Sequence, residues 1–359
     1  MKNPVWHKIH SDLKLNGVSY SPLEISKLGN TLVNEGNSFE TAMGEFLLDW
    51  FSDKPTLTVL TSGSTGTPKS IKLKKEHMVN SALATGQYFK LKEGTIALLC
   101  LPFSGIAGKM MLVRAMVLGW QLDYVEPSST PLLDSEKKYD FAAMVPLQVQ
   151  SSLKQLYRVD LLIIGGAPVN STLKKDLQTL HTNCFETYGM TETITHIAVK
   201  AINGPQCSDF FQTLPGVQIS TDKRGCLTIE APDISDEKVV TNDLVNMVSK
   251  NKFEWLGRYD SIINSGGIKL VPEQIERKLA PIIPFRFFVA GLPDKVLGHR
   301  LVLIIEGTQF DKENLFETIS SLKSLNKYEA PKEVFYIKSF VETKSNKVDR
   351  IKTLKKVFS

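Results

Sequence analysis

The sequence has 359 residues, a length that exceeds one compact core and predicts two or three domains. Hydrophobic residues make up 42% of the chain and charged residues 23%, as is usual for a soluble globular protein. The formal net charge of +5 is compatible with anionic small-molecule ligands. It is too small for a nucleic-acid-binding surface.

The four cysteines are scattered and form no CxxC pair. This spacing argues against a structural zinc site and a disulfide framework, and it favours a reducing cytoplasm. The N-terminal stretch MKNPVWHKIHSDLKL has no apolar core of signal-peptide length, and no apolar run is long enough to span a membrane. We therefore expect a cytoplasmic protein.

The first regular elements surround a loop rich in Gly, Ser and Thr. Residues 38–51 have helical apolar spacing, with Ser38 as the expected N-cap. Residues 56–60 predict a short strand, and 71–75 alternate apolar and basic residues like a second strand. The loop between them, TSGSTGTPKS, departs from the P-loop pattern because Pro68 stands where glycine is needed. A phosphate held here would be bound by backbone amides and hydroxyls, without the helix N-terminus that a P-loop uses.

Strand and helix patterns alternate through the following residues. Residues 95–103 and 139–146 predict buried strands. The apolar run 159–166 is typical of a parallel strand covered on both faces. Asn170 or Ser171 is the expected N-cap of the next helix. This alternation predicts an α/β domain.

A glycine-rich stretch, 257–272, precedes a second set of elements. The patterns there predict helices at 272–280 and 312–323 and strands at 286–292, 300–307 and 333–340. About 100 residues suffice for a small α+β domain. We place the boundary between Arg258 and Ser261.

Five stretches together resemble the adenylate-forming superfamily of acyl-CoA synthetases, adenylation domains and luciferases. They occur in the order TSGSTGTPKS (61–70), GGAPV (165–169), ETYGMTET (186–193), GRYD with SGGIKLVPEQIE (257–276), and KSNKVDR (344–350). The likeness runs from about residue 56 to the C-terminus, and YGMTET is its most specific part. It implies an AMP-binding α/β domain over 1–259 and a small, mobile α+β lid domain over 260–359. Only 60 residues precede the loop, so the first domain is shorter than in typical members. That difference could shrink the acid pocket or expose an edge that a second subunit covers in a homodimer.

The loop residues can bind an anion. Hydroxyls can donate hydrogen bonds, glycines allow close backbone approach, and the lysine adds a point charge. Read alone, a Gly/Ser/Thr loop of this kind is better explained as a solvated turn. The resemblance implies contact with the β- and γ-phosphates of ATP for Thr61, Ser62, Gly63, Ser64, Thr65, Gly66 and Lys69.

Other stretches are expected to bind the nucleoside. GGAP follows a buried strand at its carboxyl end, where ligands bind in open α/β sheets, although a tight turn alone would explain it. Tyr188 could stack on a base or pack in the core. TNDL (241–244) resembles the family's T-G-D stretch, with Asn242 in place of glycine. The resemblance implies adenine and ribose contacts for Gly165, Gly166, Ala167, Thr187, Tyr188, Gly189, Asp243 and Arg258.

The catalytic residues are carried over from the resemblance. Thr191 and Glu192 would bind phosphate and Mg²⁺, because a carboxylate suits this hard cation; the alternative for Glu192 is a surface charge. Lys347 aligns with the family's adenylation lysine, with Asn346 where glycine is usual. A solvated charge is its alternative, since several basic residues crowd this tail. Asp260 aligns with the hinge between the family's domains.

The resemblance implies a two-step reaction with ATP, Mg²⁺, coenzyme A and a small carboxylic acid as substrates or cofactors. The carboxylate attacks the α-phosphate to give an acyl-adenylate and pyrophosphate, and the acyl group then passes to a thiol. Ser265, Gly266 and Gly267 would line the thiol's path, which favours coenzyme A over a carrier protein. An inactive nucleotide-binding module is the alternative from another class.

Residues 101–119 correspond to the region that lines the family's acyl pocket. Ser104 stands near the family's usual histidine, and Lys109 and Arg114 lie on a largely apolar helix, where Lys109 could simply extend to solvent. Arg114 is better suited to bind a second carboxylate with two hydrogen bonds. A dicarboxylate with an aromatic body would match. Within the family, the likeness is nearest to the short bacterial o-succinylbenzoate–CoA ligases of menaquinone synthesis.

Overall fold

The computed structural model describes residues 5–60, 69–133, 136–307, 312–343 and 348–358. The chain divides into two compact units, which are described separately. The first comprises Met1–Ile219, Ile229–Val239 and Val248–Phe253, and the second comprises Ser220–Thr228, Val240–Met247 and Glu254–Ser359. The domain boundary expected between Arg258 and Ser261 stays a prediction. No helix in the described ranges combines the length and apolar character needed to cross a membrane.

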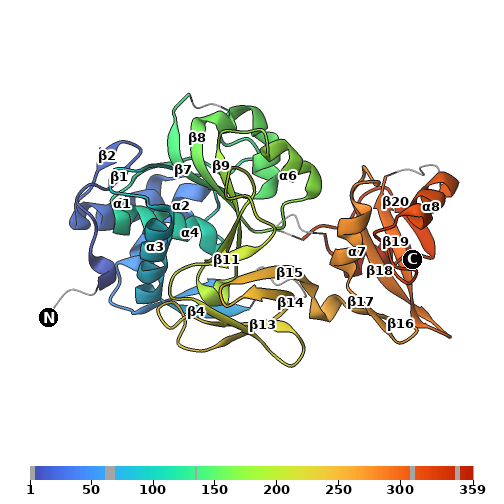
Figure 1. The fold of residues 1–359 in the computed structure, drawn as a ribbon. Helices are drawn as coiled ribbons and strands as arrows, with labels where there is room; N and C mark the ends of the chain where they lie inside the picture. Colours follow the sequence, from blue (N-terminus) through green and yellow to red (C-terminus); the bar gives the residue numbers. More distant parts are fainter. Residues whose placement is uncertain (1–4, 61–68, 134–135, 308–311, 344–347, 359) are drawn as a thin grey trace. The chain divides into compact units, whose positions relative to one another are not determined.

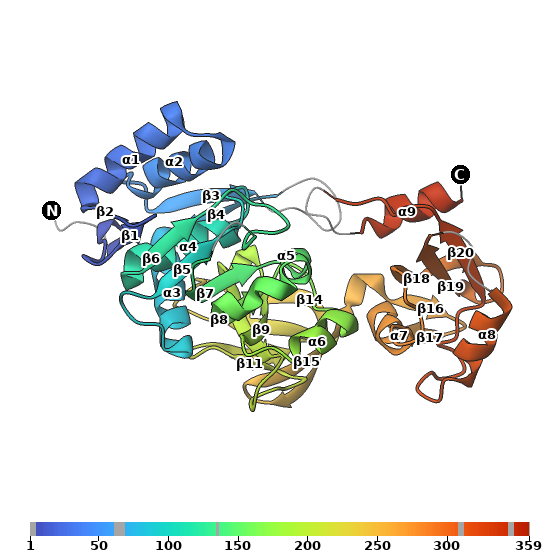
Figure 2. The same ribbon diagram turned by 90° about the horizontal axis from the view of Figure 1, so that it is seen from above.

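The first unit begins with two short strands and a pair of packed helices. Strands β1 (Lys14–Leu15) and β2 (Val18–Ser19) are antiparallel, and α1 (Pro22–Glu35) and α2 (Ser38–Trp50) lie side by side (Figures 1 and 2). The prediction that Ser38 caps α2 is wrong. Asn37 is the N-cap, because its side chain accepts hydrogen bonds from the backbone N–H groups of Phe39 and Glu40. The carboxylate of Glu40 accepts from the Asn37 backbone in return, so the helix starts with a full capping box.

The two strands expected around the Gly/Ser/Thr loop form an antiparallel hairpin. Strand β3 (Thr56–Leu60) pairs with β4 (Ser70–Lys74) from Thr56↔Lys74 to Leu60↔Ser70. The strand–loop–strand prediction is therefore confirmed. Residues 61–68 of the loop lie outside the described ranges. Helix α3 (Lys75–Phe89) follows β4 directly.

The central sheet of the first unit has the order β11-β10-β9-β8-β7-β5-β6-β1-β2. The run from β9 to β1 is parallel, as the apolar run at 159–166 predicted, whereas β10 and β11 add antiparallel strands after β9. The strands not yet located are β5 (Ile96–Leu99), β6 (Gln121–Tyr124), β7 (Tyr139–Met144), β8 (Val159–Ile164), β9 (Asn183–Gly189), β10 (His196–Ala201) and β11 (Phe211–Thr213).

Helices cover both faces of this parallel sheet, which explains the long apolar runs in its inner strands β7 and β8. On one face, Phe89 of α3 contacts Phe141 and Phe185, and α4 (Ile106–Leu118) packs beside α3. On the other face, α5 (Pro146–Ser151) and α6 (Ser171–Leu177) complete an apolar core. The N-cap of α6 is Asn170, which is one of the two residues predicted for this position. The α/β fold class is confirmed.

The second unit contains the predicted α+β elements. Its sheet has the order β17-β16-β19-β18, with β20 parallel to β19. Helices α7 and α8 pack on one face and α9 on the other. The elements are β16 (Ile263–Ser265), β17 (Ile268–Leu270), α7 (Pro272–Leu279), β18 (Phe287–Asp294), β19 (Gly298–Glu306), α8 (Lys312–Ser321), β20 (Glu333–Ile337) and α9 (Arg350–Val357).

Four strands lie along the chain between β11 of the first unit and β16 of the second unit. Some of their residues belong to the first unit and others to the second. They are β12 (Gln218–Thr221), β13 (Cys226–Glu230), β14 (Val239–Ser249) and β15 (Lys252–Arg258). Within the second unit, the hydroxyl of Thr241 donates to the Leu227 carbonyl at 2.8 Å, so this part of β14 lies beside β13.

Candidate functional site

Two of the predicted nucleoside-binding stretches, the GGAP turn and residues 187–189, meet at the carboxyl ends of two neighbouring parallel strands. Strand β8 ends at Ile164, and the GGAP turn follows it. Strand β9 pairs with β8 up to Ile164↔Glu186, so its final residues lie beside that turn. The Thr187 hydroxyl donates to the Ile164 carbonyl at 3.1 Å. A Cβ on Gly165 would lie 2.6 Å from the Thr187 oxygen, so a side chain there would displace this hydroxyl.

A buried carboxylate, which the sequence did not single out, supports this edge. Glu186 is 8% exposed, and it accepts a hydrogen bond from the Val169 backbone at 3.2 Å. Its other oxygen is 2.7 Å from the ammonium of Lys200, which lies over the Phe211 ring. Glu186 thereby ties the turn after β8 to β9 and β10. Tyr188 is half-buried and contacts Phe211.

Gly189 ends β9 where the backbone of β10 approaches most closely. A Cβ there would lie 2.2 Å from the Thr195 carbonyl oxygen and 2.5 Å from the His196 Cα. Because these are backbone atoms, the strand pair would have to separate. We expect Gly189→Ala to lower the free energy of unfolding by about 1–3 kcal/mol or more, measured by urea denaturation. Gly105→Ala is the control, since a Cβ there meets nothing within 4 Å; an equal loss in both variants would contradict this expectation.

A strained turn connects the predicted catalytic residues to β10. Thr191 and Glu192 lie in the short 3₁₀ turn Thr191–Thr193, where the Glu192 side chain is exposed. The next residue, Ile194, has φ 63° and ψ −60°, an unusual conformation for a β-branched residue. The Thr195 N–H donates to the Thr193 carbonyl across it, at 2.6 Å. Such strain costs about 1–3 kcal/mol and tends to occur at functional sites.

Thr195, which follows this turn, contacts the buried guanidinium of Arg114. Arg114 of α4 is 2% exposed, and it donates to the hydroxyls of Thr85 and Thr195, each at 3.3 Å. Its remaining hydrogen bond is to the Met111 sulfur at 3.7 Å. Within the described ranges, all of its partners are neutral and no carboxylate forms an ion pair with it. Burial lowers the pKa of Arg114 to about 10, so it keeps its charge at neutral pH.

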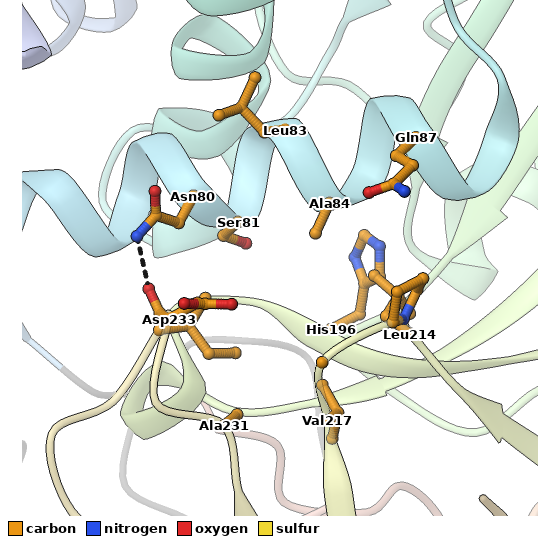
Figure 3. A pocket seen from close by; sticks show the side chains of 13 residues that line it. Asn80, Ser81, Leu83, Ala84, Gln87, His196, Leu214, Val217, Ala231 and Asp233 are labelled. Atoms are coloured by element: carbon orange, nitrogen blue, oxygen red, sulfur yellow. Dashed lines mark hydrogen bonds between the residues drawn. The ribbon is translucent and has the colours of Figure 1, made fainter.

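A cavity of about 360 Å³ lies between α3 and the segment that precedes β14 (Figure 3). Its walls combine apolar side chains with a few polar ones, as small-molecule sites do. The Asn80 amide donates to the Asp233 carbonyl at 2.8 Å and joins the two walls. The lining residues are Asn80, Ser81, Leu83, Ala84, Gln87, His196, Leu214, Pro215, Gly216, Val217, Ala231, Asp233 and Ile234.

His196 connects this cavity to Arg114. Its Nδ1 is 3.3 Å from the Thr195 hydroxyl, and the ring is 5% exposed. Burial, and secondly the charge of Arg114, hold the pKa of His196 well below its usual range, so the imidazole is neutral. Its Nε2 has no hydrogen-bond partner in the described part of the chain. The sequence analysis did not single out His196, and the strained residue Ile194 two positions before it is visible only in the structure.

The other two predicted acyl-pocket residues lie apart from Arg114. The Lys109 ammonium donates to the Phe103 carbonyl and lies over the Phe46 ring of α2, at 5.7 Å from its centroid. Burial lowers the pKa of Lys109. Ser104 is exposed at the start of the same region. The structure therefore directs Lys109 toward α2, whereas Arg114 faces α3 and the residue that precedes β10.

In the second unit, the predicted ribose-binding and hinge residues form one network. Asp243 is buried; its carboxylate accepts from the indole N–H of Trp255 at 3.2 Å and lies 3.7 Å from Arg258. Arg258 also forms two hydrogen bonds to Asp260, at 3.0 and 3.1 Å. The hydrogen bond from Arg258 is the main cause that lowers the pKa of Asp260. One arginine thus connects the predicted ribose carboxylate to the predicted hinge residue.

Asn242, the residue that departs from the T-G-D pattern, forms a hydrogen bond through its side chain. The guanidinium of Arg224 donates to the Asn242 side-chain oxygen at 2.8 Å and to the Thr241 carbonyl at 3.0 Å. It also lies over the Tyr259 ring, at 5.1 Å. The asparagine therefore contributes to a contact between β14 and the turn that joins β12 to β13.

The SGG stretch is the tip of a hairpin. Ser265 pairs with Ile268, so Gly266 and Gly267 form a two-residue loop. Their φ angles are 57° and 82°, as in a type I′ turn, which disfavours residues with a side chain. Both glycines are exposed.

Two groups of predicted residues lie outside the described ranges: the loop residues 61–66 and Lys347. Lys69, at the end of the loop, is described and is exposed. As a ligand for Mg²⁺, Glu192 fits the expected chemistry, because this ion is held by one or two carboxylates together with phosphate oxygens and water.

Residues 40–219, half of the chain, match the AMP-binding enzyme family. The chain belongs to the AMP-binding enzyme family. The match ends before Asp243, Arg258 and the second unit, so their roles do not follow from it.

Solved structures of this fold share the architecture of the chain. An acyl-CoA synthetase (AMP-forming)/AMP-acid ligase II-like protein of Dyadobacter fermentans is 39% identical, with a TM-score of 0.62. That comparison covers 92% of this chain and 98% of the other chain. The O-succinylbenzoate coenzyme A synthetase of Bacillus subtilis, solved with ATP and a magnesium ion, has a TM-score of 0.70 at 19% identity over 83% of this chain and 69% of its own. At that identity the second likeness shows the fold alone.

A curated relative is the 2-succinylbenzoate–CoA ligase of Escherichia coli strain K12. It is 25% identical over 290 residues, which are 76% of this chain and 62% of the relative. The chain thus matches less than two thirds of that member of the AMP-binding enzyme family.

Proposed function

We propose that this chain is an AMP-forming acid–thiol ligase that activates a carboxylic acid with ATP and transfers the acyl group to coenzyme A. Membership of the AMP-binding enzyme family and the acyl-CoA synthetase and ligase names among its relatives support the reaction class. The meeting of the GGAP turn with Thr187 at the ends of β8 and β9 supports a nucleotide site there. A cytoplasmic location and a homodimer are part of the same proposal.

The protein's contribution to the first step would be positioning and charge stabilisation. The buried carboxylate of Asp243 would accept hydrogen bonds from the ribose hydroxyls, with Arg258 beside it. Loop residues 61–66 and Lys69 would hold the β- and γ-phosphates. Thr191 and Glu192 would bind phosphate and Mg²⁺, and the ion would neutralise phosphate charge. Lys347 would stabilise the charge that builds between the acid and the α-phosphate.

For the acid substrate, we propose a dicarboxylate with an aromatic body, of the 2-succinylbenzoate type. The observation that carries this proposal is the buried, charged Arg114, which is bonded to neutral groups within the described ranges. A buried charge without a counter-charge is costly, so a protein that keeps one commonly uses it to bind an anion. The second carboxylate of the acid would supply that anion. Thr195 and His196 would extend the site toward the cavity.

Coenzyme A is the proposed acceptor, and Ser265 with the hairpin glycines Gly266 and Gly267 would lie along its path. Loading of a carrier protein is the alternative acceptor. The presence of Glu192, Asp243, Arg258 and Lys347 at the family's functional positions argues against an inactive nucleotide-binding module.

ATP–pyrophosphate exchange over a panel of acids tests the proposal. The panel contains 2-succinylbenzoate, benzoate, a short aliphatic dicarboxylate and no acid. We expect exchange with 2-succinylbenzoate to exceed exchange with benzoate, followed by consumption of coenzyme A on its addition. Exchange without acid, or no exchange with any acid, would contradict the proposed reaction. Exchange with a different acid would contradict only the proposed substrate.

A further inference from the structure

The cavity beside α3 lies wholly within the first unit, and the imidazole of His196 forms part of its wall. Figure 3 shows this ring among Ala84, Gln87 and Leu214. In the sheet, His196 pairs with Gly189, the residue that ends β9 at the predicted nucleoside edge. A group that extends from a nucleotide bound at this edge would therefore lie beside the cavity.

A chain of hydrogen bonds decides which nitrogen of His196 carries the proton. Arg114 donates to the Thr195 hydroxyl oxygen at 3.3 Å, which leaves the hydroxyl hydrogen to be donated elsewhere. Within the described ranges, the acceptor within reach of that hydrogen is Nδ1 of His196, at 3.3 Å. The charge of Arg114 also disfavours an N–H directed toward it, so Nδ1 keeps its lone pair. The neutral imidazole therefore carries its proton on Nε2.

This tautomer leaves a buried donor without an acceptor. The ring of His196 is 5% exposed, its Nε2 is shielded from solvent, and this nitrogen has no hydrogen-bond partner in the described part of the chain. Buried polar groups in folded proteins are nearly always hydrogen-bonded, so one without a partner at the wall of a cavity points to a bound molecule that supplies it. Because Nε2–H is a donor, the matching atom of that molecule is an acceptor oxygen.

The other walls of the cavity suit an uncharged group. Among the described residues that line it, none is a lysine or an arginine, and the charged one is the exposed carboxylate of Asp233. That carboxylate would repel an anion, whereas Leu83, Leu214 and Ile234 provide apolar surface. The cavity volume of about 360 Å³ exceeds the roughly 150 Å³ that suffices for a benzene molecule. The cavity therefore fits the uncharged aromatic body of an acid better than its carboxylates.

We infer that this cavity takes the uncharged body of the acid, and that His196 is a specificity-determining residue whose Nε2–H donates to an oxygen on that body, such as that of an aryl ketone. This inference rests on the proposed function. Arg114 has five N–H donors, of which three make the contacts described above, so it can bind the second carboxylate and keep its hydrogen bond to Thr195. The two contacts are distinct, because Arg114 selects for the charge and His196 for the ketone.

The test measures kcat/KM for ATP–pyrophosphate exchange with two acids in the full-length protein. One is 2-succinylbenzoate, which has a ketone beside its ring, and the other is 2-(3-carboxypropyl)benzoate, in which a methylene group replaces that ketone. Wild type should prefer the ketone by roughly 3–10-fold, the usual contribution of one hydrogen bond between uncharged groups. His196→Leu removes the donor and should bring the ratio of the two acids to within about 2-fold of unity.

His77→Leu is the matched control for His196→Leu. His77 is a half-buried histidine of α3 that lies 3.6 Å from Asp236 and outside the cavity lining. Its replacement should leave the wild-type ratio of the two acids unchanged. His196→Gln keeps an N–H donor and should retain part of the preference for the ketone.

Because the preference is a ratio measured in one preparation, it does not depend on the fraction of the protein that is folded. If His196→Leu is inactive, His196→Phe gives the same comparison with a ring that has no donor. Equal use of the two acids by wild type would mean that a water molecule satisfies Nε2. That result, or a preference that persists without the donor, would overturn the inference while the proposed function stands. No exchange by wild type with either acid would overturn the proposed substrate, and this inference with it.

Discussion

Lys347→Ala should lower ATP–pyrophosphate exchange by roughly 10²–10³-fold, the usual effect of removing one preorganised contact to a developing charge. Thioester formation from supplied acyl-adenylate should stay within about 2-fold of wild type, because the α-phosphate has already reacted in that substrate. The measurement is the ratio of the two half-reaction rates in the same preparation. This ratio separates a role in the first step from general damage to the protein.

Lys355→Ala provides the control for Lys347, because Lys355 is an exposed lysine of α9 in the same basic tail. If the tail acts only through its net charge, the two variants should lose similar activity. If Lys347 acts at the α-phosphate, only Lys347→Ala should lose exchange. An equal loss of both half-reactions in Lys347→Ala would refute its assignment to adenylation.

The elements with strong local signals were predictable from the sequence. Strand β3 has the predicted bounds 56–60, and the apolar run at 159–166 is a parallel strand in the sheet interior. Both signals are apolar patterns ended by turn residues, which depend on neighbours along the chain. The N-cap of α2 was missed by one position, because Asn37 and Ser38 are both capping residues and only the backbone decides between them. At α6, where Asn170 and Ser171 pose the same choice, the asparagine again caps the helix.

The candidate site was less predictable, because its contacts join distant parts of the chain. The sequence marks Arg114 as a basic residue on an apolar helix, and such a residue can extend to solvent. Its burial follows from hydrogen bonds to Thr85 and Thr195, which are 29 and 81 residues away. Lys109, five positions earlier on the same helix, lies over Phe46 instead. No local pattern distinguishes these two outcomes.

Arg114→Met should lower kcat/KM for an aromatic dicarboxylate by roughly 10²–10³-fold. Removing the partner of a buried, hydrogen-bonded charge costs about 2–5 kcal/mol, and each 1.36 kcal/mol is a factor of about ten. A monocarboxylic analogue makes no ion pair with Arg114, so its kcat/KM should change by less than about 5-fold. Comparing kcat/KM for the two acids in wild type and variant separates the loss of the charge interaction from any change in ATP binding, which would affect both acids alike.

The same variant should be at least as stable as wild type without substrate, in contrast to its lost activity. Arg114 is a buried charge whose described partners are neutral, and replacing such a group by an apolar side chain of similar size can stabilise a protein by about 1–4 kcal/mol. Arg158→Met is the control, because Arg158 is also buried but pairs with Glu136 at 2.8 Å and donates to the Leu132 carbonyl. Thermal denaturation should therefore show an unchanged or higher Tm for Arg114→Met and a lower Tm for Arg158→Met. The opposite result would be a lower Tm for both variants, together with an equal loss of kcat/KM for the dicarboxylate and the monocarboxylic analogue in Arg114→Met. It would mean that Arg114 stabilises the helix packing and does not bind a second carboxylate.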